Sequence, residues 1–256
     1  LALELADAGI HAMVEKPLAI DTQSAEKITA AFKAKGLVGA VGHIERYNPA
    51  LQQLRIRLEK GELGDVYQIA TRRQGPFPAR IADVGVIKDL ATHDIDLTAW
   101  VAGSKFASIS ARTAHKSGRP HEDLVAATGL LANGIITSHL VNWLTPFKER
   151  LTIVTGERGT LVADTLTADL TLYTNASVAT QWDSVSAFRG VSEGEVVRYA
   201  FPKIEPLLVE HESFRDAVLG LPGATEKIVT MEQGLATVAV AQAMIESANQ
   251  KVTINL

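Results

Sequence analysis

A charged tripeptide, Glu15-Lys16-Pro17, directly follows a short apolar run at residues 11–14. A helical stretch that ends at Gly9 comes before this run, so the local order is helix, glycine, buried strand and charged pair. Open α/β sheets bind ligands beyond the carboxyl ends of their parallel strands, which is where this order places Lys16. The feature therefore predicts a parallel sheet with a lysine on its ligand side, followed by a proline whose preceding peptide bond is able to be cis.

The early position of this tripeptide is a second constraint. Only residues 1–14 come before it, whereas a ligand site several strands into a parallel sheet needs a longer stretch of chain. The chain begins with Leu1, and its first residues include two acids and no basic segment, so they do not resemble a signal peptide. We therefore expect this sequence to be an enzyme whose first third is absent.

Composition excludes several classes of protein. The formal net charge of −4 over 256 residues argues against a nucleic-acid or anionic-membrane partner. The chain has no cysteine, which excludes disulfides and thiolate chemistry. No apolar run approaches the ~18–20 residues that span a bilayer. We expect a cytoplasmic, globular protein.

Residues 1–47 show the pattern of consecutive α/β units. A helix is predicted from Asp21 to Gly36, and residues 37–42 form a second strand that is apolar throughout, as expected where both faces are covered. Asn48-Pro49 then has the composition of a helix start. These residues predict the end of a parallel, nucleotide-binding domain.

From Asp65 onward the pattern changes to short strands joined by tight turns. Asn133-Gly134 is the favoured dipeptide of a two-residue hairpin, and residues 156–159 form a second reversal. The predicted strands lie near 66–73, 106–115, 123–132, 135–144, 150–155, 159–164 and 168–173, and the predicted helices at 88–101, 205–219 and 231–249. The fold class is α/β plus α+β, ending in an open, mostly antiparallel sheet with flanking helices. An open sheet face favours a homodimer or homotetramer.

Asp89 and His93 are four residues apart on a predicted helix, which places them on one face. A carboxylate one turn before an imidazole orients it and raises its basicity, as a general base requires. The alternative is a helix-start acid and a structural histidine. Asp94 and Asp96 are expected to be solvated or to cap the helix.

Lys16 and the Asp89/His93 pair together fit the oxidation of an alcohol by a nicotinamide. The histidine accepts the hydroxyl proton, the ammonium stabilises the developing alkoxide, and the nicotinamide takes the hydride. A solvated surface lysine is the alternative for Lys16 alone.

The segments VEKPLA (14–19) and DLATHDID (89–96), with a helix and a buried strand between them, resemble the glucose–fructose oxidoreductase/inositol dehydrogenase (Gfo/Idh/MocA) family. The resemblance implies a partial NAD(P)-binding Rossmann domain at 1–47 and a substrate-binding and oligomerisation domain at 48–256. It implies that Lys16, Asp89 and His93 are catalytic. Residues 42–50 and 142–161 resemble the branch that oxidises C3 of UDP-N-acetylhexosamines.

The glycine-rich fingerprint of such domains does not occur in this sequence. The glycines at 36, 39 and 42 have the wrong spacing and lie in a strand. The expected remainder of the cofactor site is the nicotinamide end, formed by Glu15, Lys16, Pro17 and His43, with Glu45 as a further candidate. Because the pyrophosphate anchor is missing, we expect this chain to bind NAD or NADP weakly or not at all.

Arginines near predicted strand ends are candidates for binding the diphosphate of a nucleotide sugar. The substrate candidates are Arg46, Tyr47, Asn48, Arg72 and Arg80. Because neighbouring strand residues face opposite ways, at most one of Arg72 and Arg73 is expected to point into the site. Trp143 and Lys148 fit sheet packing and surface charge equally well. His115 and His121 have no third ligand at a useful spacing, so no metal site is expected.

The sequence thus predicts an NAD(P)-dependent dehydrogenase that transfers a hydride between a nicotinamide and a sugar or nucleotide-sugar hydroxyl. Two alternatives remain. One is a non-catalytic assembly or sugar-binding module. The other is a dehydrogenase of the same family for inositols, free sugars or another ring substrate.

Overall fold

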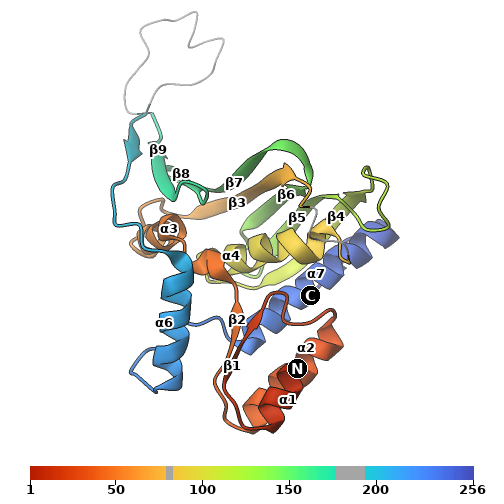
Figure 1. Ribbon diagram of the computed structural model, residues 1–256. Coiled ribbons are helices and arrows are strands. Elements are labelled where there is room, and N and C mark those ends of the chain that lie inside the picture. The colour runs from red at the N-terminus through yellow and green to blue at the C-terminus, as the bar shows by residue number, and fades with distance from the viewer. Residues whose placement is uncertain (79–82, 177–193) are drawn as a thin grey trace, which may run out of the picture.

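A two-stranded parallel sheet and a nine-stranded sheet organise the computed structural model, which describes residues 1–78, 83–176 and 194–256 (Figure 1). In the small unit, β1 (Ala12–Glu15) pairs with β2 (Gly39–Gly42) in parallel, with Val14 opposite Val41. The helices α1 (Ala2–Asp7) and α2 (Thr22–Ala34) flank these strands. Asp21 caps α2 by accepting a 2.7 Å hydrogen bond from the Ser24 amide, so the predicted α/β units at 1–47 are confirmed.

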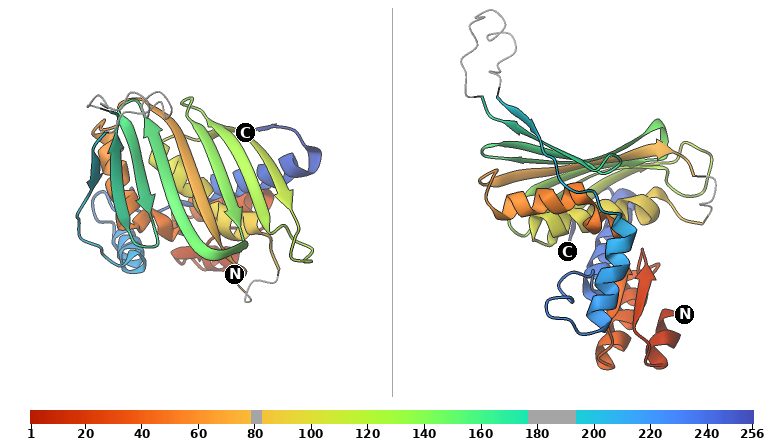
Figure 2. Two further views of the ribbon diagram at one scale, coloured as in Figure 1. Left: turned by 90° about the horizontal axis from the view of Figure 1, so that it is seen from above. Right: turned by 60° about the vertical axis from the view of Figure 1, so that its left-hand side comes forward.

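The C-terminal part of the chain completes the core of this small unit. Helix α6 (Pro206–Val218) and helix α7 (Met231–Gln250) both lie against it (Figure 2). Val229 and Met231 share a buried cluster with Phe32 and Val41. A Cβ at Gly39 would lie 2.7 Å from Met231 Cγ, so glycine is what permits this close approach. Residues far apart in the sequence therefore form a single packing unit around β1 and β2.

The large sheet has the strand order β10-β9-β8-β7-β3-β6-β5-β4-β11. Every neighbouring pair is antiparallel except β3 and β6, which confirms the open, mostly antiparallel sheet. Its strands are β3 (Val66–Pro76), β4 (Phe106–Ala114), β5 (Leu124–Leu131), β6 (Ile136–Asn142), β7 (Leu144–Gly156), β8 (Gly159–Asp164), β9 (Asp169–Thr174), β10 (Val196–Arg198) and β11 (Ile254–Asn255). The reversal at Asn133-Gly134 joins β5 to β6 as predicted, with Gly134 at φ +87°.

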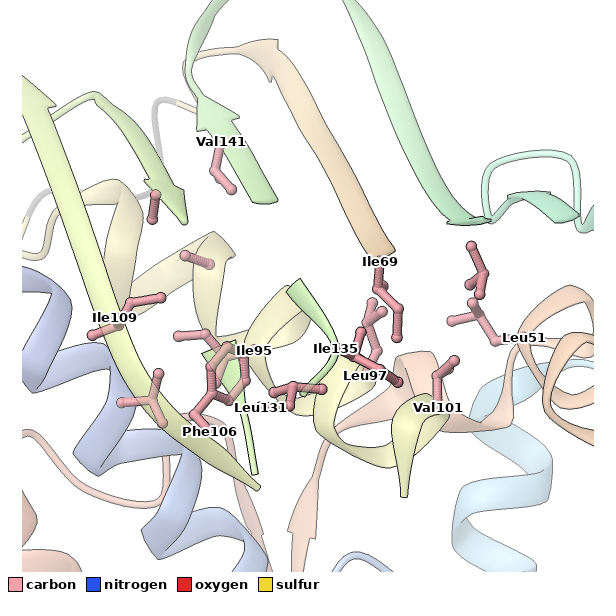
Figure 3. Close-up of a cluster of buried hydrophobic side chains, with 14 of the residues drawn as sticks. Leu51, Ile69, Ile95, Leu97, Val101, Phe106, Ile109, Leu131, Ile135 and Val141 are labelled. Carbon is pink, nitrogen blue, oxygen red and sulfur yellow. The ribbon is translucent and has the colours of Figure 1, made fainter. Parts of the chain in front are cut away.

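One face of the large sheet carries the main core. Helices α3 (Pro49–Glu59), α4 (Thr92–Ala102) and α7 pack on it (Figures 1 and 2). Leu51, Ile69 and Ile95 are almost completely buried there (Figure 3). No helix covers the opposite face in the described structure, where Ile136 is 56% exposed (Figure 2).

The structure differs from the predicted elements at the site. The predicted helix at 88–101 begins with a π-helical turn, η2 (Ile87–Ala91), before α4. A 3₁₀ turn, η1 (Ile44–Tyr47), joins β2 to α3. Strand β7 starts at Leu144, six residues before the predicted strand at 150–155. In the described parts of the chain, no helix combines the length and apolar character needed to cross a membrane.

Candidate active site

Lys16 and Asp89 meet where β1 ends and the π-helical turn passes over it. Lys16 Nζ donates to the main-chain oxygen of Asp89 at 2.5 Å and lies 3.2 Å from its Oδ1. The Lys16-Pro17 peptide bond is cis. Burial lowers the pKa of Lys16, and the Asp89 carboxylate offsets part of that effect. The predicted ligand-side lysine therefore lies in a partly dehydrated position with one carboxylate beside it.

His93 lies in the first turn of α4 and is half-buried. Its Nδ1 is sealed from solvent and has no hydrogen-bond partner among the described residues. Burial holds the pKa of His93 well below its usual value, and the charges of Arg73, Lys16, His43 and Arg150 act in the same direction. His93 is therefore a neutral imidazole close to several cationic side chains.

The expected orientation of His93 by Asp89 is not found. No hydrogen bond between these two side chains occurs in the described structure, because the carboxylate binds the Lys16 ammonium instead. The pKa of His93 is lowered overall rather than raised, with burial as the largest cause. The geometry makes Asp89 a positioning partner of Lys16.

Asp94 is buried in an ion pair rather than solvated, which corrects the expectation from the sequence. Arg73 Nε donates to Asp94 Oδ1 at 2.8 Å, and Arg73 Nη1 donates to Glu45 Oε1 at 2.7 Å. Burial alone would lower the pKa of Arg73, but Asp94 and Glu45 together raise it. The Arg73 guanidinium thus joins β3, α4 and η1.

Asp96 is also buried and paired. Arg46 donates from Nε to Asp96 Oδ2 at 2.8 Å and from Nη2 to Oδ1 at 2.6 Å. Its Nη1 donates to Gln233 Oε1 at 2.9 Å. All three guanidinium nitrogens are therefore engaged inside the protein, so these contacts do not support the predicted substrate role of Arg46.

Tyr47 and Asn48 also have internal partners. Tyr47 is 6% exposed, and burial, followed by the charge of Glu210 on α6, raises its pKa. Asn48 accepts a 3.0 Å hydrogen bond from the Ala50 amide as the N-cap of α3, and its Nδ2 donates to Thr165 O at 3.1 Å. These contacts fix the start of α3.

The neighbouring arginines of β3 face opposite ways, as predicted. Arg73 is buried on the helix-covered face, whereas Arg72 has a 48% exposed side chain and pairs with Glu149. The arginine near the catalytic candidates is therefore Arg73, and Arg72 lies on the opposite face of the sheet. Arg80 lies outside the described residues.

Arg150 is a site residue that the sequence reasoning missed. It stands directly opposite Arg73 in the β3–β7 pairing, with a 33% exposed side chain. It lies in the segment 142–161 that carries the branch resemblance and is the first residue of the predicted strand at 150–155. Its pairing with Arg73 on β3 is a long-range contact that strand alternation alone does not reveal.

The nicotinamide-end candidates gather at the carboxyl ends of β1 and β2. A Cβ on Gly42 would lie 3.1 Å from Glu15 Oε2, so the Glu15 side chain extends over β2. His43 is 1% exposed, and neither of its ring nitrogens has a hydrogen-bond partner among the described residues. Its Nδ1 lies 3.9 Å from Asp96 Oδ2, and a buried imidazole without a hydrogen bond leaves polar atoms that a ligand group can satisfy. Pro17 follows in the same turn.

Other features that resemble ligand sites do not include these residues. No group of three or more His, Cys, Asp or Glu side chains able to hold a metal occurs in the described parts of the chain. A cavity of about 550 Å³ lies between α4 and α7, and neither Lys16 nor His93 lines it. Phe77 and Trp143 pack edge to face at 5.4 Å, with the Arg119 guanidinium 4.2 Å from the Phe77 ring.

Comparison with known proteins finds a family match over part of the chain. Residues 51–162 match the GFO/IDH/MocA C-terminal domain. The UDP-N-acetylglucosamine 3-dehydrogenase of Acidithiobacillus ferrooxidans is 38% identical over 98 residues, covering 38% of this chain and 30% of that protein. The scyllo-inositol 2-dehydrogenase (NAD(+)) of Bacillus subtilis is 29% identical over 114 residues, covering 43% and 33%. The chain thus spans about a third of the length of these curated relatives.

Solved structures share the fold. The A. ferrooxidans UDP-N-acetylglucosamine 3-dehydrogenase superposes with a TM-score of 0.81 at 23% identity, covering 97% of this chain and 76% of that one. A levoglucosan dehydrogenase in complex with NADH superposes with a TM-score of 0.81 at 18% identity, covering 99% and 75%. The resemblance predicted from the sequence is confirmed, because residues 51–162 match the GFO/IDH/MocA C-terminal domain and the fold is shared with these oxidoreductases.

Proposed function

We propose that this chain forms the substrate half and the nicotinamide end of an NAD(P)-dependent dehydrogenase acting on a sugar or nucleotide-sugar hydroxyl. The observation that carries the proposal is the contact of Lys16 with Asp89, 73 residues away, within electrostatic range of His93. A partly dehydrated ammonium beside a neutral imidazole suits the removal of a proton from an alcohol.

His93 is the proton acceptor in this proposal. Its Nδ1 is sealed, so we assign the ring proton to Nδ1 and the free lone pair to Nε2. The lowered pKa of His93 keeps the imidazole unprotonated and ready to accept the hydroxyl proton in the oxidation direction. The reverse reduction requires the protonated ring, which the surrounding cations disfavour.

Lys16 stabilises the oxygen that loses its proton. Asp89 holds the ammonium through two oxygens, which fixes its direction without consuming all of its donors. Glu15, Pro17 and His43 would hold the nicotinamide end of the cofactor, which when bound supplies the hydride acceptor. The orphaned nitrogens of His43 support this placement.

For the substrate, we propose C3 of a UDP-N-acetylhexosamine. The support is the name of the A. ferrooxidans relative, 38% identical over 98 residues. An inositol is the second candidate, because the B. subtilis scyllo-inositol dehydrogenase also matches this chain.

We also propose that the open sheet face is the contact between copies of this chain. Leu130 and Ile136 are large apolar side chains, 43% and 56% exposed, on the two neighbouring strands β5 and β6 of that face. Size-exclusion chromatography with light scattering should give a dimer or tetramer, and Ile136→Glu should shift it toward monomer. A monomeric wild-type protein would refute this proposal.

The activity is tested by NAD(P) reduction in the full-length gene product that carries this sequence, with UDP-N-acetylglucosamine and scyllo-inositol as substrates. His93→Gln should lower turnover by about 10²- to 10⁴-fold. His211→Gln is the matched control, because His211 is exposed on α6. Turnover of His93→Gln close to wild type would refute the assignment, and a protein that binds sugar without any NAD(P) reduction would favour the binding-module alternative.

A further inference from the structure

Arg150 stands opposite Arg73 across the β3–β7 pair. In an antiparallel pair, directly opposed residues share a face of the sheet, so both guanidinium groups lie on the face that α4 covers. The two strands are neighbours in the sheet (Figure 1). Arg150 therefore reaches into the layer that holds the Lys16, Asp89 and His93 side chains.

The two arginines differ in how fully their donors are used. Arg73 is 3% exposed and donates to both Asp94 and Glu45. The only ionic contact of Arg150 in the described structure is a 3.5 Å approach of Nη1 to Glu45 Oε1, a carboxylate that Arg73 already binds more closely. A guanidinium has five N–H donors, so most of those on Arg150 remain available.

The electrostatic position of Arg150 also favours an anion. Burial lowers the pKa of Arg150, and the charge of Arg73 lowers it further. A cation that is partly dehydrated and close to a second cation gains stability when an anionic group binds it. The charge of Arg150 contributes to the lowered pKa of His93, and the charge of Asp89 raises the pKa of Arg150. The free donors of Arg150 therefore lie close to the proposed reaction centre.

We infer that Arg150 binds an oxyanion carried by the substrate and thereby selects charged sugar derivatives over neutral polyols. The inference rests on the proposed function, because it places that anion in the same site as the reacting hydroxyl. A diphosphate and a sugar carboxylate both suit the planar fork of an arginine. A neutral inositol leaves this cation without a partner.

Ligand binding tests the inference without requiring turnover. Isothermal titration of the full chain with UDP-N-acetylglucosamine, glucuronate and scyllo-inositol separates a diphosphate, a carboxylate and an uncharged ring. Arg150→Gln should weaken the binding of the preferred anion by about 10- to 100-fold. Arg150→Lys should weaken it less, because it keeps the charge and loses the fork.

Arg72→Gln is the matched control, since it removes the same charge from the neighbouring strand on the opposite face. It should leave the affinity within about twofold of wild type. Equal affinity of wild type and Arg150→Gln for both anions would overturn the inference, as would a preference of the wild-type chain for scyllo-inositol. Should Arg150→Gln fail to fold by circular dichroism, anion affinity of Arg150→Lys equal to wild type would overturn it.

The two proposals can fail independently. If anion binding depends on Arg150 but the protein reduces no NAD(P), the proposed dehydrogenase activity is refuted and this inference stands. Turnover of a neutral sugar that is unchanged in Arg150→Gln would do the reverse.

Discussion

Two lysines of the small unit bind an aspartate in the same way but in different surroundings. Lys16 contacts the main-chain oxygen and Oδ1 of Asp89 at 2.5 and 3.2 Å, and Lys35 contacts those of Asp7 at 2.8 and 3.3 Å. The side chains of the first pair are 15% and 11% exposed, and those of the second are 40% and 80% exposed. The contacts are alike, so burial distinguishes the candidate catalytic pair from a surface pair.

A third class of pair lies deeper still. The Arg73 and Asp94 side chains are each 3% exposed. Neither charged group is accessible to a substrate. These three pairs divide by expected role: the exposed Lys35–Asp7 pair contributes little, the Lys16–Asp89 pair forms part of the candidate site, and the buried Arg73–Asp94 pair joins α4 to β3. The following predictions test that division, beginning with the largest expected effect.

Removing the buried guanidinium should be the most damaging change. Arg73→Met leaves Asp94 and Glu45 without their shared cation, and we expect a loss of about 3–5 kcal/mol in the free energy of unfolding. Urea denaturation followed by circular dichroism measures it. Arg72→Met is the control and should change stability by less than about 1 kcal/mol. Equal effects of the two variants would contradict the proposed role of the buried pair.

Removing the half-buried ammonium should affect catalysis more than folding. Lys16→Met should lower turnover in the full-length gene product by about 10²- to 10³-fold, because the oxygen that loses a proton then has no ammonium beside it. Lys35→Met removes the exposed counterpart and should leave turnover unchanged. If both variants retained wild-type turnover, the proposed catalytic role of the buried Lys16 ammonium would be refuted.

Part of this site follows from local sequence. The strand before Lys16, the hairpin at Asn133-Gly134 and the opposite directions of Arg72 and Arg73 depend on neighbouring residues, and all were predicted correctly. Strand alternation and turn chemistry are short-range rules, so the pattern of a few residues suffices.

The pairing of charged groups does not follow from local sequence. Asp89 has His93 one turn away, yet its partner is Lys16, 73 residues distant. Asp94 and Asp96 were predicted to be solvated because their arginine partners are distant in sequence, on β3 and η1. Which cation reaches a buried carboxylate is decided by tertiary packing, which a helical spacing cannot reveal.

Glu210 extends the comparison to a buried acid without a cation. It is 2% exposed, its Oε1 has no partner among the described residues, and burial, followed by the charge of Glu15, raises its pKa to about 7. The folded state therefore binds the proton more tightly than the unfolded state, whose pKa lies near 4.5. Its contribution to stability is complete below pH 4.5 and is lost as the pH rises toward 7.

Glu210→Gln removes this dependence on pH. Above pH 7 the variant should be more stable than wild type by about 3 kcal/mol, and the difference should vanish near pH 4. Thermal unfolding at a series of pH values measures it. A difference that stays constant over this range would show that Glu210 titrates normally.

The smallest expected effect is at Asn48, which the sequence predicted to bind the substrate. Asn48→Ala removes the cap of α3 and should cost about 1 kcal/mol of stability. Affinity for UDP-N-acetylglucosamine should not change, because the Asn48 side chain binds protein atoms on both sides. A loss of affinity with unchanged stability would restore the substrate role.

The central claim is that Asp89 binds the Lys16 ammonium rather than His93, and that His93 is a neutral imidazole close to several cationic side chains. An NMR titration of the His93 ring nitrogens tests it directly, with the signals of the seven histidines assigned by the loss of one set in His93→Gln. The account predicts a midpoint well below pH 6.5 and no protonated ring at neutral pH. A midpoint at or above pH 6.5 would contradict it and would return Asp89 to the role of raising the basicity of His93.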